Sequence, residues 1–125
     1  MKPSYSLNEF KRACKQENTE VNIMTGAKEA ARIDFGLTSK EDILNVIGNN
    51  RLERPKFIST KKWENNPNPK KPVMVDSYGF YFGYLYGYIA FMFTRGGWII
   101  KSFKKNTEID VRYFPFRDSL KGMIH

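Results

Sequence analysis

The sequence predicts an α+β fold in which short N-terminal helices pack on a small antiparallel β-sheet. Helix-capping patterns and helical spacing of apolar residues occupy the first fifty residues. Aromatic and β-branched residues then dominate residues 77–104, which favours strands over helices. Because 125 residues suffice for one core, we expect a single domain over residues 1–115 and a C-terminal tail over 116–125.

The first two expected helices are bounded by residues with clear capping roles. Ser6 and Glu9 form a capping box, which opens a helix over about residues 7–17. Thr25 is expected to cap the second helix, and Gly36 to end it as the residue with a left-handed backbone.

A third helix is expected directly after a short turn. Thr38 and Glu41 form a second capping box, and the helix should run to about residue 47, before Gly48 stops it. Residues 21–24, between the first two helices, are too short to assign from their pattern.

Strand signals begin after residue 50. Residues 57–58 and 73–75 are expected to be short strands, and residues 65–72 between them an exposed loop, because three prolines deny that loop ladder hydrogen bonds. Residues 109–114 alternate in polarity and are expected to form one more edge strand, closed by Pro115.

Residues 77–104 are expected to form a β-hairpin around which the chain is organised. Thr94-Arg-Gly-Gly97 supplies the positive-φ residues of a tight turn, and the first arm could itself bend near Gly83 or Gly87. Residues alternate between the two faces of a strand. One face therefore carries Tyr84, Tyr86, Tyr88, Ala90 and Met92, and the other, expected to hold the helices, carries Leu85, Gly87, Ile89, Phe91 and Phe93.

The charge is concentrated in the sheet-forming part of the chain. The formal net charge is +8, yet residues 1–50 contain seven Lys/Arg and seven Asp/Glu, whereas residues 51–125 contain fourteen and six. This asymmetry indicates a localised basic surface, and polyanions or acidic proteins are its natural partners.

Other features bear on the compartment. Cys14 is the single cysteine, so it cannot form an internal disulfide, which is typical of a reducing compartment. The N-terminus lacks the pattern of a signal peptide. Residues 77–93 are too short, too rich in glycine and too rich in tyrosine for a helical membrane span. We therefore expect a cytoplasmic protein with no membrane partner.

Several kinds of chemistry are excluded by composition. His125 is the only histidine and stands at the last position, so a buried histidine base is excluded and a four-ligand zinc site is not expected. Glu108 and Asp110 are better explained as a solvated strand edge than as a metal pair. Gly79, Gly83 and Gly87 lie in a strand pattern and not in a nucleotide-binding loop. No cofactor is expected.

The remaining Lys, Arg and Tyr suit cleavage of RNA by its own 2′-hydroxyl, which needs a proton acceptor, a proton donor and cations, but no metal. Tyrosine rings can also stack unpaired bases. With a simple turn, Lys101 and Lys105 share a face with the tyrosines. A bulge at Gly87 or Gly97 would bring Lys104 to that face instead.

The same features have plainer interpretations. A strand rich in tyrosine and phenylalanine is most often core, an exposed tyrosine face is as often a protein-binding surface, and a basic run is usually a solvated surface. The alternative function is therefore a non-catalytic basic module that binds an acidic protein or a nucleic acid, such as a factor from a phage or mobile element.

Residues 11–104 resemble the MqsR family of bacterial toxin–antitoxin ribonucleases, which are related to RelE-type toxins. The resemblance rests on Met24-Thr25 with Ala27 and Ala31, Phe35-Gly36-Leu37-Thr38, residues 42–47, Leu52 with Phe57-Ile58-Ser59, the strand 84–93, and Ile99-Ile100-Lys101-Ser102-Phe103-Lys104. The last motif resembles the Ser-Phe-Lys that ends the family's domain.

The resemblance implies an α+β domain, cleavage of mRNA and neutralisation by a small antitoxin. The functionally important lysine of Ser-Phe-Lys matches Lys104, and a family tyrosine falls near Tyr86, with Tyr84 and Tyr88 as register alternatives. A further family lysine, in Phe-Tyr-Lys-Ser, has no counterpart in register, and only Lys61 or Lys56 could replace it through a shift.

The sequence thus predicts a metal-independent endoribonuclease. The predicted catalytic residues are Lys104, Tyr86 and Lys101, and the predicted RNA-binding residues are Lys56, Lys61, Lys62, Trp63, Tyr84, Tyr88, Arg95 and Lys105.

Overall fold

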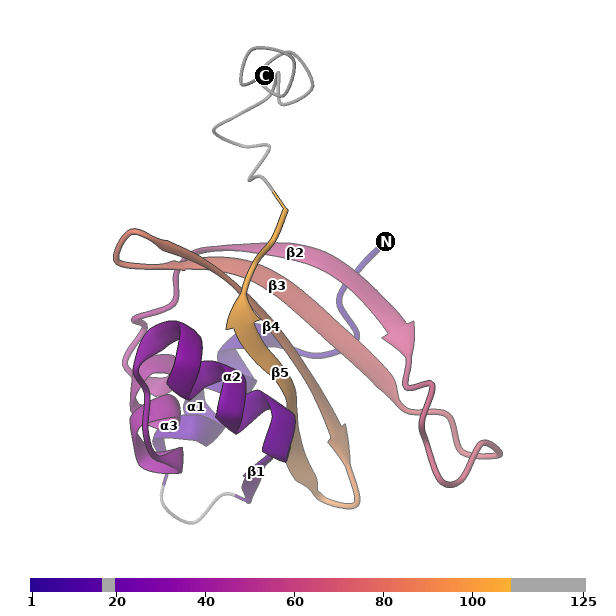
Figure 1. The fold of residues 1–125 in the computed structure, drawn as a ribbon. Helices are drawn as coiled ribbons and strands as arrows, with labels where there is room; N and C mark the ends of the chain where they lie inside the picture. The colour runs from indigo at the N-terminus through magenta and orange to yellow at the C-terminus, as the bar shows by residue number, and fades with distance from the viewer. Residues whose placement is uncertain (17–19, 109–125) are drawn as a thin grey trace.

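The computed structural model describes residues 1–16 and 20–108 (Figure 1). Within these residues the element order is α1 (Leu7–Lys15), β1 (Val21–Ile23), α2 (Thr25–Phe35), α3 (Lys40–Gly48), β2 (Glu53–Lys62), β3 (Met74–Phe82), β4 (Leu85–Thr94) and β5 (Gly97–Lys105). The strands form one sheet in the order β1-β5-β4-β3-β2. The predicted α+β class is therefore confirmed.

The first two helices begin and end near the predicted positions. The Ser6 side chain accepts a hydrogen bond from the backbone N–H of Glu9 at 3.2 Å, which caps α1 as expected. Gly36 ends α2 with a φ of 70°, the left-handed conformation that glycine adopts without strain. Thr25, predicted as the cap of α2, is its first residue, and Met24 precedes it without a side-chain cap.

The cap of α3 lies one residue later than predicted. Ser39 accepts the backbone N–H of Asp42 at 3.1 Å. Thr38 is the wrong choice, because its hydroxyl donates to the Asp42 carboxylate at 3.2 Å and so stands outside the helix. The helix also includes Gly48 instead of stopping before it.

The sheet is mixed, not purely antiparallel as predicted. β2, β3, β4 and β5 pair antiparallel, but β1 pairs in parallel with β5, with Val21 opposite Trp98. The ambiguous residues 21–24 thus supply an edge strand. Residues 77–93, expected as one arm, contain most of two strands, because the chain turns between Phe82 and Leu85. The turn starts at Gly83, one of the two glycines where a bend of this arm was expected, and its φ is 61°.

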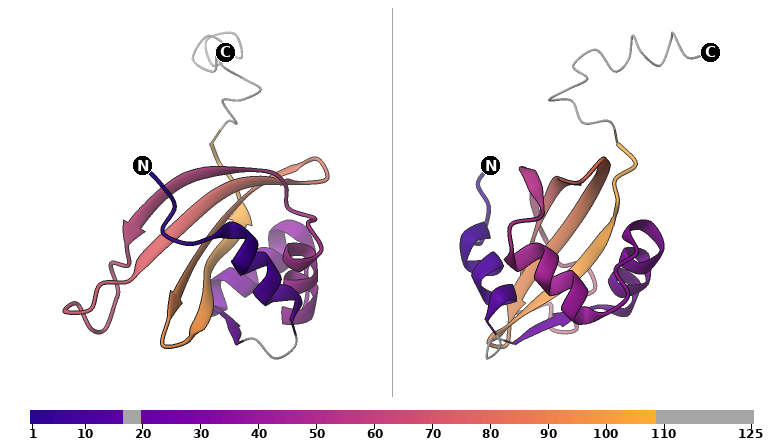
Figure 2. Two further views of the ribbon diagram at one scale, coloured as in Figure 1. Left: turned by 180° about the vertical axis from the view of Figure 1, so that it is seen from behind. Right: turned by 90° about the vertical axis from the view of Figure 1, so that its left-hand side faces the viewer.

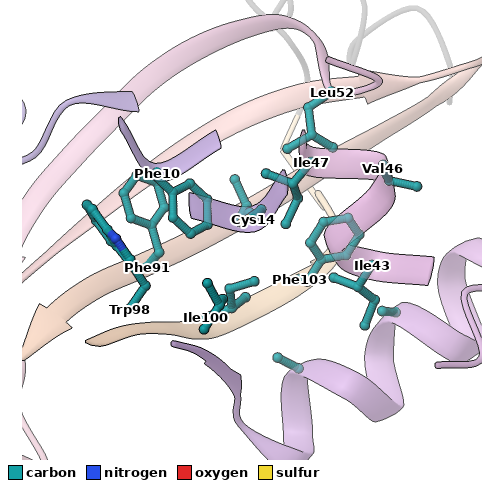
Figure 3. Close-up of a cluster of buried hydrophobic side chains, with 14 of the residues drawn as sticks. Phe10, Cys14, Ile43, Val46, Ile47, Leu52, Phe91, Trp98, Ile100 and Phe103 are labelled. Atoms are coloured by element: carbon teal, nitrogen blue, oxygen red, sulfur yellow. The ribbon is translucent and has the colours of Figure 1, made fainter. Parts of the chain in front are cut away.

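All three described helices cover one face of the curved sheet (Figure 2). The core between them contains the ring of Phe10 from α1, stacked on Phe91 of β4 with 3.9 Å between centroids (Figure 3). Phe35 of α2 packs against Phe80 and Phe103. These aromatic contacts fix the helices on the sheet.

The face predicted to hold the helices is only partly buried. Ile89 and Phe91 are buried as expected. Leu85 and Phe93 are 38% and 41% exposed, because they lie beside the turns at the two ends of β4, beyond the helices.

A buried carboxylate ties the N-terminal segment to the sheet. Asp76 of β3 is fully buried and accepts the backbone N–H groups of Ser4 at 3.0 Å and Tyr5 at 2.9 Å. The Tyr5 hydroxyl donates to the carbonyl of Met74 at 2.7 Å. Burial, and secondarily the Asp76 charge, raise the pKa of the neighbouring Tyr78. Residues 4–5 are therefore part of the packed domain.

The predicted edge strand at 109–114 and the tail at 116–125 lie outside the described residues. None of the described helices is long and apolar enough to cross a membrane.

Asp76→Ala should lower the free energy of unfolding by about 2–4 kcal/mol, because two hydrogen bonds to a buried charge are lost. Asp76→Asn should cost about half as much, since its one carbonyl oxygen can still accept one N–H. Urea denaturation measures both. A cost for Asp76→Ala no larger than that of Glu64→Ala, a control at an exposed position after β2, would contradict the role of Asp76 in holding residues 4–5.

Cys14 should react with iodoacetamide at pH 8 only when the chain unfolds. Burial raises the pKa of its thiol to about 12, and the side chain is 7% exposed. Because the folded pKa lies above the unfolded value, the stabilisation from the neutral thiol is present below about pH 8.5 and is lost as the pH rises through 12. Rapid labelling without denaturant would contradict this burial.

Candidate functional site

The face of the sheet opposite the helices carries the candidate site, and we call it the open face. The strand register and the alternation of side chains assign its residues. Among them are Lys56, Ser59 and Lys61 of β2, Val75, Ser77, Gly79 and Tyr81 of β3, Tyr86, Tyr88, Ala90 and Met92 of β4, and Ile99, Ser102 and Lys104 of β5.

A bulge in β5 decides which lysines reach the open face. Near the turn the register is the predicted one, with Phe93 opposite Trp98. Further along, Phe91 lies opposite Ile100 but Ala90 opposite Ser102, so Lys101 is an extra residue in β5. The predicted alternatives, Gly87 and Gly97, are both wrong as the position of the bulge. Its expected effect nevertheless holds, because Lys104 lies opposite Tyr88.

Most of the predicted residues line one cavity of about 590 Å³ on the open face. The predicted site residues among its lining are Lys56, Tyr86, Tyr88, Lys101, Lys104 and Lys105. The Lys104 ammonium lies 5.6 Å from the centroid of the Tyr88 ring, a cation–π distance. Glu108 is the one acidic residue that the described chain contributes to this lining. The cavity is therefore strongly cationic.

Tyr86 is held in place by a row of neighbours on the open face. Its ring lies 5.0 Å from that of Tyr81, and the Arg54 guanidinium lies 4.3 Å from the centroid of the Tyr81 ring. A Cβ atom at Gly79 would come within 2.5 Å of the Tyr86 hydroxyl, so the absence of a side chain there makes room for the phenol.

This supporting row was missed by the sequence reasoning. Gly79 and Tyr81 alternate in the sequence, a signal that they share a face, but only the turn at residues 83–84 places them beside Tyr86. Arg54 gave no signal, because it reaches Tyr81 from an irregularity in β2, where its φ is 49°.

A second cavity of about 190 Å³ adjoins the first. Lys61, Lys62 and Trp63 line it, together with Tyr88 and Lys101, which line both cavities. The predicted RNA-binding residues of β2 are thus brought beside the predicted catalytic lysines. Their hydroxyl neighbours Ser59 and Ser77 bond to each other at 2.9 Å across the two strands.

Two predicted residues lie away from this group. Tyr84 is fully exposed in the β3–β4 turn and lines neither cavity. Arg95 lies in the β4–β5 turn and lines a third cavity. Lys105 occupies an intermediate place: its backbone N–H donates to the Asp34 carboxylate of α2 at 2.9 Å, although it also lines the first cavity.

The cluster suits an anionic ligand with flat groups. Ammonium groups can hold phosphate oxygens, and the exposed parts of tyrosine rings can stack bases or exchange protons. Within residues 1–16 and 20–108, no three His, Cys, Asp or Glu side chains gather in a way that could hold a metal ion.

No family model, curated protein or solved structure matches this chain. The resemblance to the MqsR family therefore stays a prediction from the sequence motifs.

Gly79→Ala should displace Tyr86, because the new methyl group overlaps the phenol hydroxyl. We expect a loss of about 1–3 kcal/mol in the free energy of unfolding, typical of overpacking, and a changed NMR environment for the Tyr86 ring. Gly26→Ala is the control, since a Cβ there meets nothing within 4 Å. Unchanged Tyr86 resonances in Gly79→Ala would contradict the close approach.

Proposed function

We propose that the chain is a metal-independent endoribonuclease that cleaves RNA by attack of its own 2′-hydroxyl. The observation that carries the proposal is the bulge at Lys101, which groups Lys101 and Lys104 with Tyr86 and Tyr88 in one cavity. This is the set of groups that the reaction needs without a metal: cations for the developing phosphorane charge, and a phenol and amines for proton transfer.

The proposed roles follow from position. Lys104 and Lys101, on either side of Ser102, hold the scissile phosphate and stabilise its added negative charge. Tyr86, fixed between Tyr81 and Gly79, donates a proton to the 5′-oxygen as its bond to phosphorus breaks, and the 2′-hydroxyl loses its proton to solvent as its oxygen bonds to phosphorus. Tyr88, whose ring faces the Lys104 ammonium, stacks on a neighbouring base.

We further propose that the protein is the toxin of a bacterial toxin–antitoxin system acting on mRNA. Support comes from the resemblance of residues 99–104 to the terminal motif of the MqsR family. A small antitoxin or another acidic protein would be attracted to the basic open face, since the cavity lining holds four lysines and one glutamate.

A second candidate is a non-catalytic module that binds an acidic protein through the same face. Ile58 favours it, because this side chain lines the cavity yet is 44% exposed, as expected of an apolar contact for a protein partner. Such a module would bind without cleaving RNA.

Lys104→Ala should lower the rate of cleavage of single-stranded RNA by about 10²–10³-fold, the usual cost of losing one stabiliser of a developing oxyanion. Cleavage should persist in EDTA, leave a 2′,3′-cyclic phosphate, and stop when the substrate lacks the 2′-hydroxyl. Gel analysis of labelled oligonucleotides measures all three.

Lys28→Ala is the matched control, because it removes the same charge from an exposed position on α2, over the other face of the sheet. If Lys28→Ala slows cleavage as much as Lys104→Ala does, the proposed catalytic role of Lys104 is contradicted. Intact RNA in the presence of the unaltered protein, together with tight binding of an acidic protein, would favour the second candidate.

A further inference from the structure

The open face continues beyond the candidate site as a series of cavities along β4. The first lies at Tyr86 and Tyr88, the second at Tyr88 and Ala90, and the third at Thr94. Tyr88 lines the first and second, and Trp63 lines the second and third. The third cavity measures about 550 Å³, nearly the size of the first. The residues that the cavities share make them one continuous track.

Trp63 stands at the centre of this track. It follows the last residue of β2, and its side chain is partly exposed. Its backbone N–H donates to the carbonyl of Val73 at 2.8 Å, which fixes the residue at the base of the 64–72 loop. Its indole ring offers a flat face on which an unpaired base can stack.

The loop beside Trp63 has internal hydrogen bonds. The Asn66 amide nitrogen donates to the carbonyl of Lys71 at 2.8 Å, and its oxygen accepts the backbone N–H of Asn68 at 2.9 Å. These bonds hold the loop in a fixed shape, and its residues Asn66, Asn68 and Lys71 form one wall of the third cavity. The wall offers polar groups beside the exposed part of the indole.

The charges along the track favour an anionic chain. Cations from four parts of the chain line the second and third cavities: Lys61 and Lys62 of β2, Lys71 of the loop, Arg95 of the β4–β5 turn and Lys101 of β5. Glu20 and Glu64 are the acidic residues that the described chain contributes to them. Cations that follow a groove, with an aromatic ring between them, are the arrangement that binds single-stranded nucleic acid.

We propose that Trp63 and the third cavity form a second base-binding subsite, which takes the single-stranded RNA that extends beyond the candidate cleavage site. This inference rests on the proposed function for the identity of the ligand. A base must be unpaired to stack on a ring, so the subsite selects single strands over duplexes. Thr94 lies eight positions after Tyr86, a span of about 27 Å at the rise of a strand, which accommodates several nucleotides.

The test is the affinity for 2′-O-methyl RNA, which binds but cannot be cleaved by 2′-hydroxyl attack. Fluorescence anisotropy compares oligonucleotides of about four and about twelve nucleotides, the range of common single-strand sites. Trp63→Ala should weaken binding of the longer strand by about 5- to 100-fold, the effect of one stacked base, and leave the shorter strand unaffected. Ile33→Ala, which removes an exposed apolar side chain of α2 outside all three cavities, is the control and should change neither.

Trp63→Phe is a second test variant, because it keeps an aromatic ring at this position and so is less disruptive to folding than Trp63→Ala. The longer strand should quench tryptophan fluorescence in the unaltered protein but not in this variant, because Trp98 is buried in the core. An equal effect of Trp63→Ala on both strands, or none on either, would overturn the subsite. The proposed enzyme activity and the proposed subsite can fail independently. If the effect of Trp63→Ala depends on strand length but ordinary RNA is not cleaved, only the proposed cleavage is refuted. If ordinary RNA is cleaved but the effect of Trp63→Ala does not depend on strand length, only the subsite is refuted.

Discussion

The need to bury both Ile100 and Phe103 governs the sheet. These residues are fully buried on the helix side, yet they stand three positions apart in β5, where side chains alternate every second residue. Both side chains can point to the helix side of the sheet only if the strand contains an extra residue between them. Burying an aliphatic or aromatic side chain contributes about 1.5–3 kcal/mol, whereas turning Phe103 outward would turn Lys104 inward, where its charge is far costlier. The bulge at Lys101 satisfies both, and Lys104 faces outward as a result.

The three-residue spacing of Ile100 and Phe103 is the feature of the sequence that indicates a bulge in this strand. The helices were predictable because caps such as Ser6 and terminators such as Gly36 act within a few residues. β1 could not be predicted, because its three residues become a strand only when β5 lies in parallel beside them. The turn at Gly83 was weakly signalled, since an aromatic run suits one long strand as well as two short ones.

The grouping of the candidate site residues could be predicted where it depends on the alternation of side chains along one strand. It could not be predicted where it depends on the order of the strands in the sheet. Tyr86 and Tyr88 share a face in any register, and a bulge brings Lys104 to them. Arg95 lies apart from the first cavity and lines the third, because the length of β4 separates its turn from Tyr86. The support of Tyr86 by Tyr81 and Arg54 depends on β3 lying between β2 and β4, which no local pattern encodes.

The buried carboxylate of β3 also has a consequence for the order of events during synthesis. Ser4 and Tyr5 leave the ribosome about seventy residues before Asp76, the group that their N–H groups bind. β1 likewise pairs with β5, which is synthesised later. The beginning of the chain can therefore dock only after the middle of the sheet has been made, so this domain closes from its later strands back to its first residues.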